Sequence, residues 1–238
     1  MDNIVGRLQS AFPSHQLDVI IGSLLGDARL ECRSKSIRGL YTARFRVHHG
    51  EKQKEYVWWK YEILKNIVSS KPKEITWINK KRNLKEISWY FHTKSLKNFG
   101  IIHEIFYKNG VKKFPIDIFP IFTDKMLAIW YMDDGSNNHG NITLSTHSFS
   151  LKDQKIIIDF LKKKYQINPT IVKDRNQWKI SIGKKDYNHF LSIVIPFIPK
   201  AMAYKIDNPR IDLSIKIGRA SNKLANTSVP NRKILEKV

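Results

Sequence analysis

The chain has a single cysteine, Cys32, few acidic residues, and no apolar run long enough to cross a membrane. One cysteine excludes a disulfide framework and a zinc finger, and it indicates a reducing compartment. The longest apolar stretch, Phe190–Ile198, covers about half of a bilayer span and contains a proline. The first sixteen residues lack the apolar core of a signal peptide. We therefore expect an intracellular protein, cytoplasmic or organellar, with no membrane partner.

Acidic residues number 21 against 42 lysines and arginines in 238 residues, so the formal net charge is +21. Hydrophobic residues make up 42% of the chain, which excludes a disordered basic tail. Divided at residue 119, the first part has 22 basic and 11 acidic residues, and the second has 20 and 10. Two similar basic surfaces are therefore expected, and nucleic acid is the leading candidate partner. A membrane surface is the weaker candidate, because no single amphipathic helix concentrates the charge.

Hydrophobic spacing predicts the same order of elements twice along the chain. The first copy is predicted as a helix over Leu17–Gly26 with Ser14 as candidate N-cap, strands over Ala28–Lys35 and Tyr41–His49, a helix over Lys54–Val68, strands over Glu74–Arg82 and Lys85–His92 around a turn at Asn83, and a helix over Leu96–Tyr107 that Asn109-Gly110 ends. The second copy is predicted as a helix over Asp124–Asp133, strands near Asn141–His147, a helix over Leu151–Tyr165, strands over Pro169–Lys173 and Gln177–Gly183, and a helix over Lys185–Ile195.

This repeat predicts an α+β fold built from two pseudo-symmetric αββαββα halves, residues 1–118 and 119–213, with antiparallel sheets that each have one polar face. Residues 214–238 form a polar, basic C-terminal tail in this prediction.

Each half opens with an apolar helix that ends in an acidic residue, Asp27 in the first and the Asp133-Asp134 pair in the second. The C-terminal end of a helix dipole disfavours a carboxylate by about 0.3–1 kcal/mol, and a bound cation would offset that cost. If the two helices pack side by side, Asp27 and Asp134 meet at their tips, where a divalent metal relieves their repulsion. On a basic surface, this arrangement suits metal-assisted phosphodiester hydrolysis. Taken alone, Asp27 could also be a helix cap or a surface carboxylate.

The segments Ile20–Ala28 and Leu127–Gly135 resemble the two signature motifs of the LAGLIDADG homing endonucleases, in the single-chain branch that carries both. The resemblance covers residues 17–210. It implies a monomeric, magnesium-dependent endonuclease of the kind used in intron homing. Such enzymes make a double-strand break in a long DNA site and leave short 3′ overhangs. The two halves differ in sequence, so the site is expected to be asymmetric, and the sheets are expected to form a DNA-binding saddle.

The resemblance implies that Asp27 and Asp134 are catalytic and hold the metal, with Gly26 and Asp133 as further metal-ligand candidates. A shift of the second motif by one residue would exchange Asp133 and Asp134. Gly22 and Gly26 stand four residues apart, which lets two helix backbones approach closely. In the second motif, Ile129 stands where the family often has glycine.

Two lysines complete the catalytic set that the resemblance implies. The stretch Lys112–Pro115 resembles the family's lysine shortly before a proline and favours Lys112 over Lys113. The stretch Ile198–Lys205 resembles its Tyr-Lys element and points to Lys205. A lysine near the scissile phosphate could stabilise transition-state charge or position the attacking water.

The polar strand faces supply the candidates for contact with double-stranded DNA, because a two-stranded ribbon fits the major groove. The candidates are Arg29, Arg33, Arg44, Arg46, His48, Lys80, Arg82, Ser88, Tyr90, Asn141, Thr143, Ser145, Lys173, Arg175, Gln177 and Lys179.

Two other functions stay open at the level of the sequence. The first is an RNA-binding intron maturase on the same fold, whose partner would be its host intron RNA. The second is a non-catalytic DNA-binding regulator, which would need neither carboxylate at the paired position.

Overall fold

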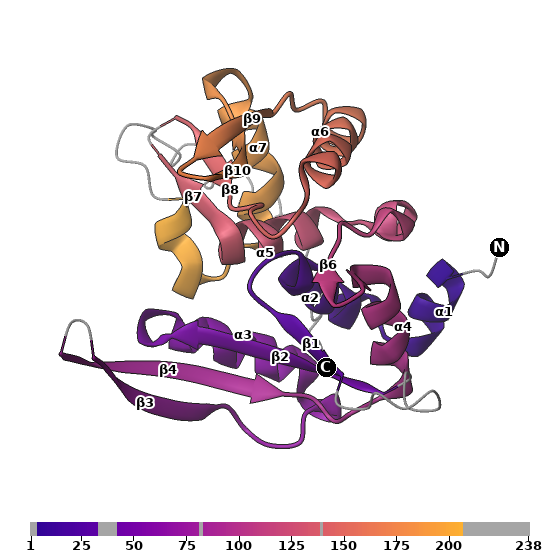
Figure 1. Ribbon diagram of the computed structural model, residues 1–238, viewed down its shortest axis with the longest axis vertical. Helices are drawn as coiled ribbons and strands as arrows, with labels where there is room; N and C mark the ends of the chain where they lie inside the picture. The colour runs from indigo at the N-terminus through magenta and orange to yellow at the C-terminus, as the bar shows by residue number, and fades with distance from the viewer. Residues whose placement is uncertain (1–3, 33–41, 81–82, 139, 207–238) are drawn as a thin grey trace, which may run out of the picture. The chain divides into compact units, whose positions relative to one another are not determined.

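The computed structural model describes residues 4–32, 42–80, 83–138 and 140–206. The described residues up to Ile206 form one compact unit (Figure 1). The predicted tail over residues 214–238 and the predicted DNA contacts Arg33 and Arg82 lie outside the described residues. Within the described part, no helix combines the length and the apolar character needed to span a membrane.

The first half follows the predicted order after one additional helix, α1 (Ile4–Ala11), which the sequence pattern did not reveal. Its elements are α2 (Ser14–Leu25), β1 (Arg29–Cys32), β2 (Ala43–Gly50), α3 (Lys54–Leu64), β3 (Lys73–Asn79), β4 (Leu84–His92) and α4 (Lys97–Phe106).

Backbone geometry tests three local predictions in this half: one helix cap and two turns. Pro13 occupies the N-cap position of α2 and Ser14 is already helical, so the predicted serine cap is wrong. Asn83 has a φ of 49°, which confirms the turn between β3 and β4. Asn109 and Gly110 have φ values of 52° and 76°, and they join the short strands β5 (Tyr107–Lys108) and β6 (Val111–Lys112). They therefore form a hairpin turn rather than a helix cap, since such turns need positive φ at both residues.

The second half repeats the order with shorter strands. Its elements are α5 (Asp124–Asp134), β7 (Gly135–Asn137), β8 (Ile142–Leu144), α6 (Leu151–Tyr165), β9 (Thr170–Asp174), β10 (Gln177–Ile182) and α7 (Lys184–Val194). Of the strands expected near Asn141–His147, β8 lies in that range, whereas its neighbour β7 begins directly after α5.

The two sheets have the same topology. The strand orders are β1-β2-β4-β3 and β7-β8-β10-β9, and every neighbouring pair is antiparallel. Helix α3 packs on β2 and β4 of the first sheet, and α6 packs on β9 and β10 of the second (Figure 1). The predicted fold class, two pseudo-symmetric α+β halves with antiparallel sheets, is confirmed.

Helices α2 and α5 pack against each other and join the two halves. Their approach depends on glycine, because a Cβ added at Gly22 would lie 2.7 Å from the Cβ of Ile129 and 2.8 Å from the carbonyl oxygen of Met126. A Cβ at Gly26 would lie 2.4 Å from the Cβ of Asp133. The larger Ile129 side chain therefore fills the space that Gly22 leaves, and one glycine per contact is enough for close packing.

Replacing Gly22 with alanine is expected to lower the free energy of unfolding by about 1–3 kcal/mol, because the added methyl overpacks the α2–α5 contact. Chemical denaturation measures this change. The matched control is Gly50→Ala, since a Cβ at Gly50 meets no atom within 4 Å. Equal stability of the two variants would contradict the close helix contact.

Candidate active site

The site lies where α2 and α5 end. Helix α2 stops at Leu25, two residues before Asp27, and Asp134 is the last residue of α5. Burial is the main cause that raises the pKa of Asp27 to about 6, and the negative charge of Asp133 raises it further. Burial also raises the pKa of Asp134 to about 7, and the charge of Asp27 is the next largest cause. The structure therefore brings the two predicted carboxylates close enough to repel each other.

The two predicted lysines lie beside these carboxylates. The Nζ of Lys112 donates to the carbonyl oxygen of Gly26 at 3.0 Å, and the Nζ of Lys205 donates to that of Gly135 at 2.6 Å. Burial lowers the pKa of both lysines, while the nearby aspartates oppose that shift. All four residues predicted as catalytic therefore gather at one place.

The Asp133 carboxylate lies next to this group, inside the protein. Its side chain is fully buried, and its Oδ1 and Oδ2 accept hydrogen bonds from the Nζ of Lys60 at 2.7 and 2.9 Å. Lys60 is itself fully buried on α3. The carboxylate predicted as a metal ligand is thus already neutralised by a lysine.

Lys60 was not predicted from the sequence, although the hydrophobic pattern of its helix contains a signal for it. Lys60 lies on the apolar stripe of α3, between Val57 and Leu64 at helical spacing, where a charge needs a buried partner. That partner, Asp133, stands 73 residues away in the other half.

His49 was also missed. It occupies the inward-facing alternation of β2 with Phe45 and Val47, and its side chain is 2% exposed. Its Nδ1 lies 3.5 Å from the Oδ2 of Asp27, and its Nε2 lies 3.2 Å from the Nζ of Lys60. Burial, followed by the Lys60 charge, lowers the pKa of His49 to about 3, so the ring is neutral at pH 7.

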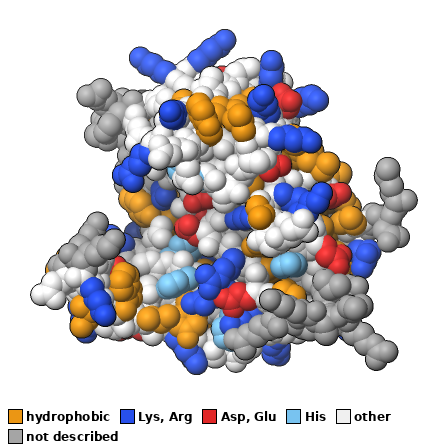
Figure 2. Space-filling view, viewed as in Figure 1, with side chains coloured by type: hydrophobic (Ala, Val, Ile, Leu, Met, Phe, Trp, Pro, Cys, Tyr) orange, Lys and Arg blue, Asp and Glu red, His pale blue; other side chains and the backbone are white. Residues whose placement is uncertain are grey.

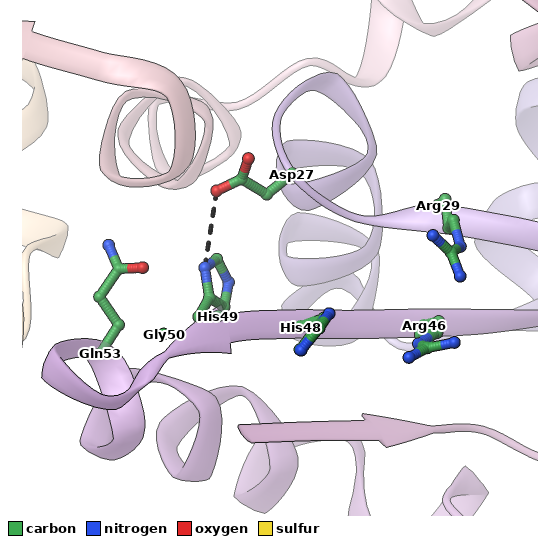
Figure 3. A pocket seen from close by; sticks show the side chains of 7 residues that line it. All are labelled: Asp27, Arg29, Arg46, His48, His49, Gly50 and Gln53. Atoms are coloured by element: carbon green, nitrogen blue, oxygen red, sulfur yellow. Dashed lines mark ion pairs between the residues drawn. The ribbon is translucent and has the colours of Figure 1, made fainter. Parts of the chain in front are cut away.

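A pocket of about 250 Å³ opens beside Asp27 (Figure 3). Figure 2 shows acidic and histidine side chains in the hollowed part of this face, with lysines and arginines around it. Within the described residues, no group of three or more His, Cys, Asp or Glu side chains is placed to hold a metal ion by itself. The pocket is lined by Asp27, Arg29, Arg46, His48, His49, Gly50 and Gln53.

Three predicted DNA contacts converge on a single acidic residue, Glu31. Its carboxylate lies 2.8 Å from Arg29, 2.6 Å from Arg44 and 3.2 Å from Arg46. Burial would raise the pKa of Glu31, but hydrogen bonds from the three arginines outweigh it and lower the pKa to about 2. The arginine heads are therefore held in place before any ligand binds, and together they carry a net positive charge.

The register of the first sheet places the other predicted contacts on the same face. His48 hydrogen bonds with Ser88 at 2.8 Å and pairs across the strands with Tyr90, whose ring lies 5.1 Å from the Arg46 guanidinium carbon. Lys80 is exposed in the turn after β3.

In the second sheet, the structure separates one candidate from the rest. Gln177, Lys179 and Ser181 share one face of β10, and Thr143 pairs with Ser181. Lys173 pairs with Trp178 and so lies on the opposite face.

The other candidates of this half lie near the strand ends. Lys179 forms an ion pair with Asp174 at 3.0 Å, and Asn141 accepts a hydrogen bond from Ser181 at 2.9 Å. Arg175 occupies the β9–β10 turn with a φ of 56°, and the backbone N–H of Ser145 donates to the carbonyl oxygen of Asp134.

The Glu31 cluster predicts a specific acid sensitivity. A carboxyl whose folded pKa is depressed stabilises the fold above its ordinary pKa of 4.5, and this contribution is lost as pH falls toward 2. The wild-type protein is therefore expected to lose more unfolding free energy between pH 5 and pH 2 than Glu31→Gln does. Denaturation at several pH values measures this, with Glu104→Gln, an exposed carboxyl on α4, as control. Parallel pH profiles for wild type and Glu31→Gln would contradict the assignment.

Comparison with known proteins agrees with this geometry. Residues 17–190 match the model of the LAGLIDADG DNA endonuclease family. The DNA endonuclease I-ChuI of Chlamydomonas applanata is 29% identical over 210 residues, covering 81% of this chain and 94% of that protein. The cytochrome b mRNA maturase bI2 of Debaryomyces hansenii is 29% identical over 197 residues, covering 81% and 73%.

A solved structure shares the fold. The homing endonuclease I-WcaI bound to its DNA recognition sequence superposes with a TM-score of 0.74 at 24% identity, covering 85% of this chain and 92% of that one. Because the family match spans more than half of the sequence, this chain belongs to the LAGLIDADG DNA endonuclease family.

Proposed function

We propose that this chain is a site-specific homing endonuclease that hydrolyses one phosphodiester bond in each strand of a long DNA site. The observation that carries the proposal is the meeting of Asp27, Asp134, Lys112 and Lys205 at the ends of α2 and α5. The mutual repulsion of the two carboxylates is what a bound cation would relieve. Both halves belong to one chain, which supports action as a monomer.

The donor set fits magnesium. Mg²⁺ is commonly held by one or two protein carboxylates together with substrate phosphate oxygens and water. Asp27 and Asp134 would hold it, whereas both oxygens of Asp133 are engaged by Lys60 and the Gly26 carbonyl accepts from Lys112. When bound, the metal polarises a phosphoryl oxygen and lowers the pKa of a bound water.

The protein's own residues orient the DNA and stabilise charge. The ammonium groups of Lys112 and Lys205 lie where negative charge develops on a scissile phosphate beside the aspartates, and fixed donors of this kind lower the barrier. Arg29, Arg44 and Arg46 present a preformed positive cluster to the backbone or to guanine edges.

The recognition site is expected to be asymmetric. The exposed face of the first sheet carries arginine and histidine, whereas that of the second carries Gln177 and Lys179. Two faces of different chemistry read two different half-sites.

Cleavage of a DNA library tests the proposal. Purified protein is incubated with genomic or randomised double-stranded DNA in Mg²⁺ and, separately, in EDTA, and the new ends are sequenced. Ends that cluster at one long asymmetric sequence only in Mg²⁺ are expected. A library that contains bound sites but yields no ends in Mg²⁺ would refute nuclease function.

A second function is favoured by the similarity to the maturase bI2 of Debaryomyces hansenii. We infer that assistance to splicing of a host intron is the alternative activity, with intron RNA as partner. Splicing of that intron in vitro with and without the protein decides between the two, and unchanged splicing would exclude the maturase role.

A further inference from the structure

We propose that a buried chain of side chains, Asp133, Lys60 and His49, positions the Asp27 carboxylate while Asp134 has no equivalent support. The inference rests on the proposed function, since it names residues that orient one of the two carboxylates of that site. Asp133 comes from α5 in the second half, whereas Lys60 and His49 come from α3 and β2 in the first. These three side chains therefore connect both halves of the protein to the single carboxylate of Asp27.

Lys60 determines where the proton of the His49 ring lies. A lysine ammonium has three N–H donors and no acceptor. Two of these donors are used by Asp133, at 2.7 and 2.9 Å, and the His49 Nε2 lies 3.2 Å from the same nitrogen. Nε2 must therefore accept, because two donors cannot face each other. The ring is neutral, and its one N–H is on Nδ1.

The Nδ1 atom faces the active site. Nδ1 lies 3.5 Å from the Oδ2 of Asp27, and Figure 3 shows Asp27 reaching from the end of α2 toward the His49 ring. Residues that hold a metal ligand in this way fix its orientation, even though they never touch the metal.

The His49 ring has little freedom to turn. It is 2% exposed and lies 5.4 Å from the buried ring of Tyr56, centroid to centroid. The Lys60 ammonium is 4.3 Å from the centroid of the same Tyr56 ring. The hydrogen-bonded chain is therefore enclosed by packing and held in one arrangement.

Only one of the two active-site carboxylates, that of Asp27, has such a neighbouring side chain in the described part of the chain. Among the residues that the structure describes, the carboxylate of Asp134 forms neither a hydrogen bond nor an ion pair, whereas the Oδ2 of Asp27 lies 3.5 Å from the His49 ring. Loss of His49 should therefore misplace one carboxylate only. The two DNA strands should respond unequally, and a general loss of folding would slow both alike.

The first test measures the tautomer and needs neither DNA nor metal. Long-range ¹H–¹⁵N spectra of histidine-labelled wild-type protein at pH 7, with His49 assigned through the His49→Asn variant, report which ring nitrogen carries the proton. The Nδ1–H form is expected. A ring protonated on Nε2, or on both nitrogens, overturns the inference whether or not the protein cuts DNA.

The second test uses the DNA site identified in the library experiment and measures the cleavage rate of each strand separately in Mg²⁺. His49→Ala is expected to slow one strand by about tenfold more than the other, so that nicked DNA accumulates. His49→Asn keeps an N–H donor near the position of Nδ1 and should restore most of the lost rate. His15→Ala, an exposed histidine at the start of α2, should cut both strands at the wild-type rate.

The outcomes separate the two proposals. Equal slowing of both strands by His49→Ala, or equal rates for His49→Asn and His49→Ala, overturns the positioning role while the nuclease assignment stands. A wild-type protein that cuts no DNA refutes the proposed function, and the tautomer measurement then decides whether His49 is oriented as inferred.

Discussion

Asp27→Asn and Asp134→Asn are each expected to abolish double-strand cleavage while DNA binding persists. Asparagine keeps the shape of the side chain but removes the charge that would hold a cation. Loss of a residue that only supports a metal ligand typically lowers activity by about 10- to 100-fold. Loss of the ligand itself should therefore lower the single-turnover cleavage rate by more than about 100-fold. Gel-shift titration in EDTA should show affinity close to that of the wild type, because the arginine cluster around Glu31 is untouched.

Protein stability distinguishes this result from misfolding. The pKa of Asp134 is raised from 3.8 to about 7, so its ionised form costs folding free energy at neutral pH. Wild-type stability relative to Asp134→Asn should therefore fall as pH rises from about 4 to 7, and the variant should melt higher at pH 7. Asp117→Asn, an exposed carboxylate, serves as the control. Undiminished cleavage by either active-site variant would contradict the assignment.

Lys60→Met is expected to have the largest effect on stability. It leaves the fully buried Asp133 carboxylate without its partner, and breaking a buried pair in this way costs about 3–5 kcal/mol. Denaturant unfolding should show this loss. The double variant Lys60→Met/Asp133→Asn removes both charges and should recover a large part of it.

Lys65→Met is the matched control for that measurement. Lys65 follows α3 directly and pairs with Glu62 at 3.3 Å, but both side chains are more than half exposed. Surface pairs of this kind contribute about 0–1 kcal/mol. A Lys60→Met variant as stable as Lys65→Met would show that the buried pair does not stabilise the fold.

The sequence predicted those parts of the fold that depend on local pattern. Helical spacing located α6 over Leu151–Tyr165 without error, and alternation located β2 and β4 to within two residues at each end. The glycine spacing of Gly22 and Gly26 also predicted the close approach of α2 and α5. These features follow from side-chain periodicity and from the absence of a Cβ.

Features decided by partners distant in sequence could not be read in the same way. Consecutive residues on a helix point about 100° apart, and the sequence pattern does not say which of Asp133 and Asp134 meets the buried Lys60. The direction depends on where α2 and α3 pack. The partner of Lys60 is likewise distant, since Asp133 lies 73 residues away in the other half.

Turn chemistry was ambiguous for a different reason. Asn109-Gly110 suits both a helix end and a two-residue hairpin, and the pairing of Tyr107 with Lys112 decided in favour of the hairpin. In the second sheet, the pairing of Lys173 with Trp178 determined which lysine shares a face with Gln177. Sequence alternation alone does not specify cross-strand register.

The most direct measurement maps both strands of the site that wild-type protein cuts in Mg²⁺. Carboxylates gathered at the tips of α2 and α5 predict one cut in each strand and no cutting in EDTA. The resemblance to the LAGLIDADG homing endonucleases implies that the cuts lie a few base pairs apart and leave short 3′ extensions. Cutting that persists in EDTA, or a complete absence of cuts at a site the protein binds, would contradict the account.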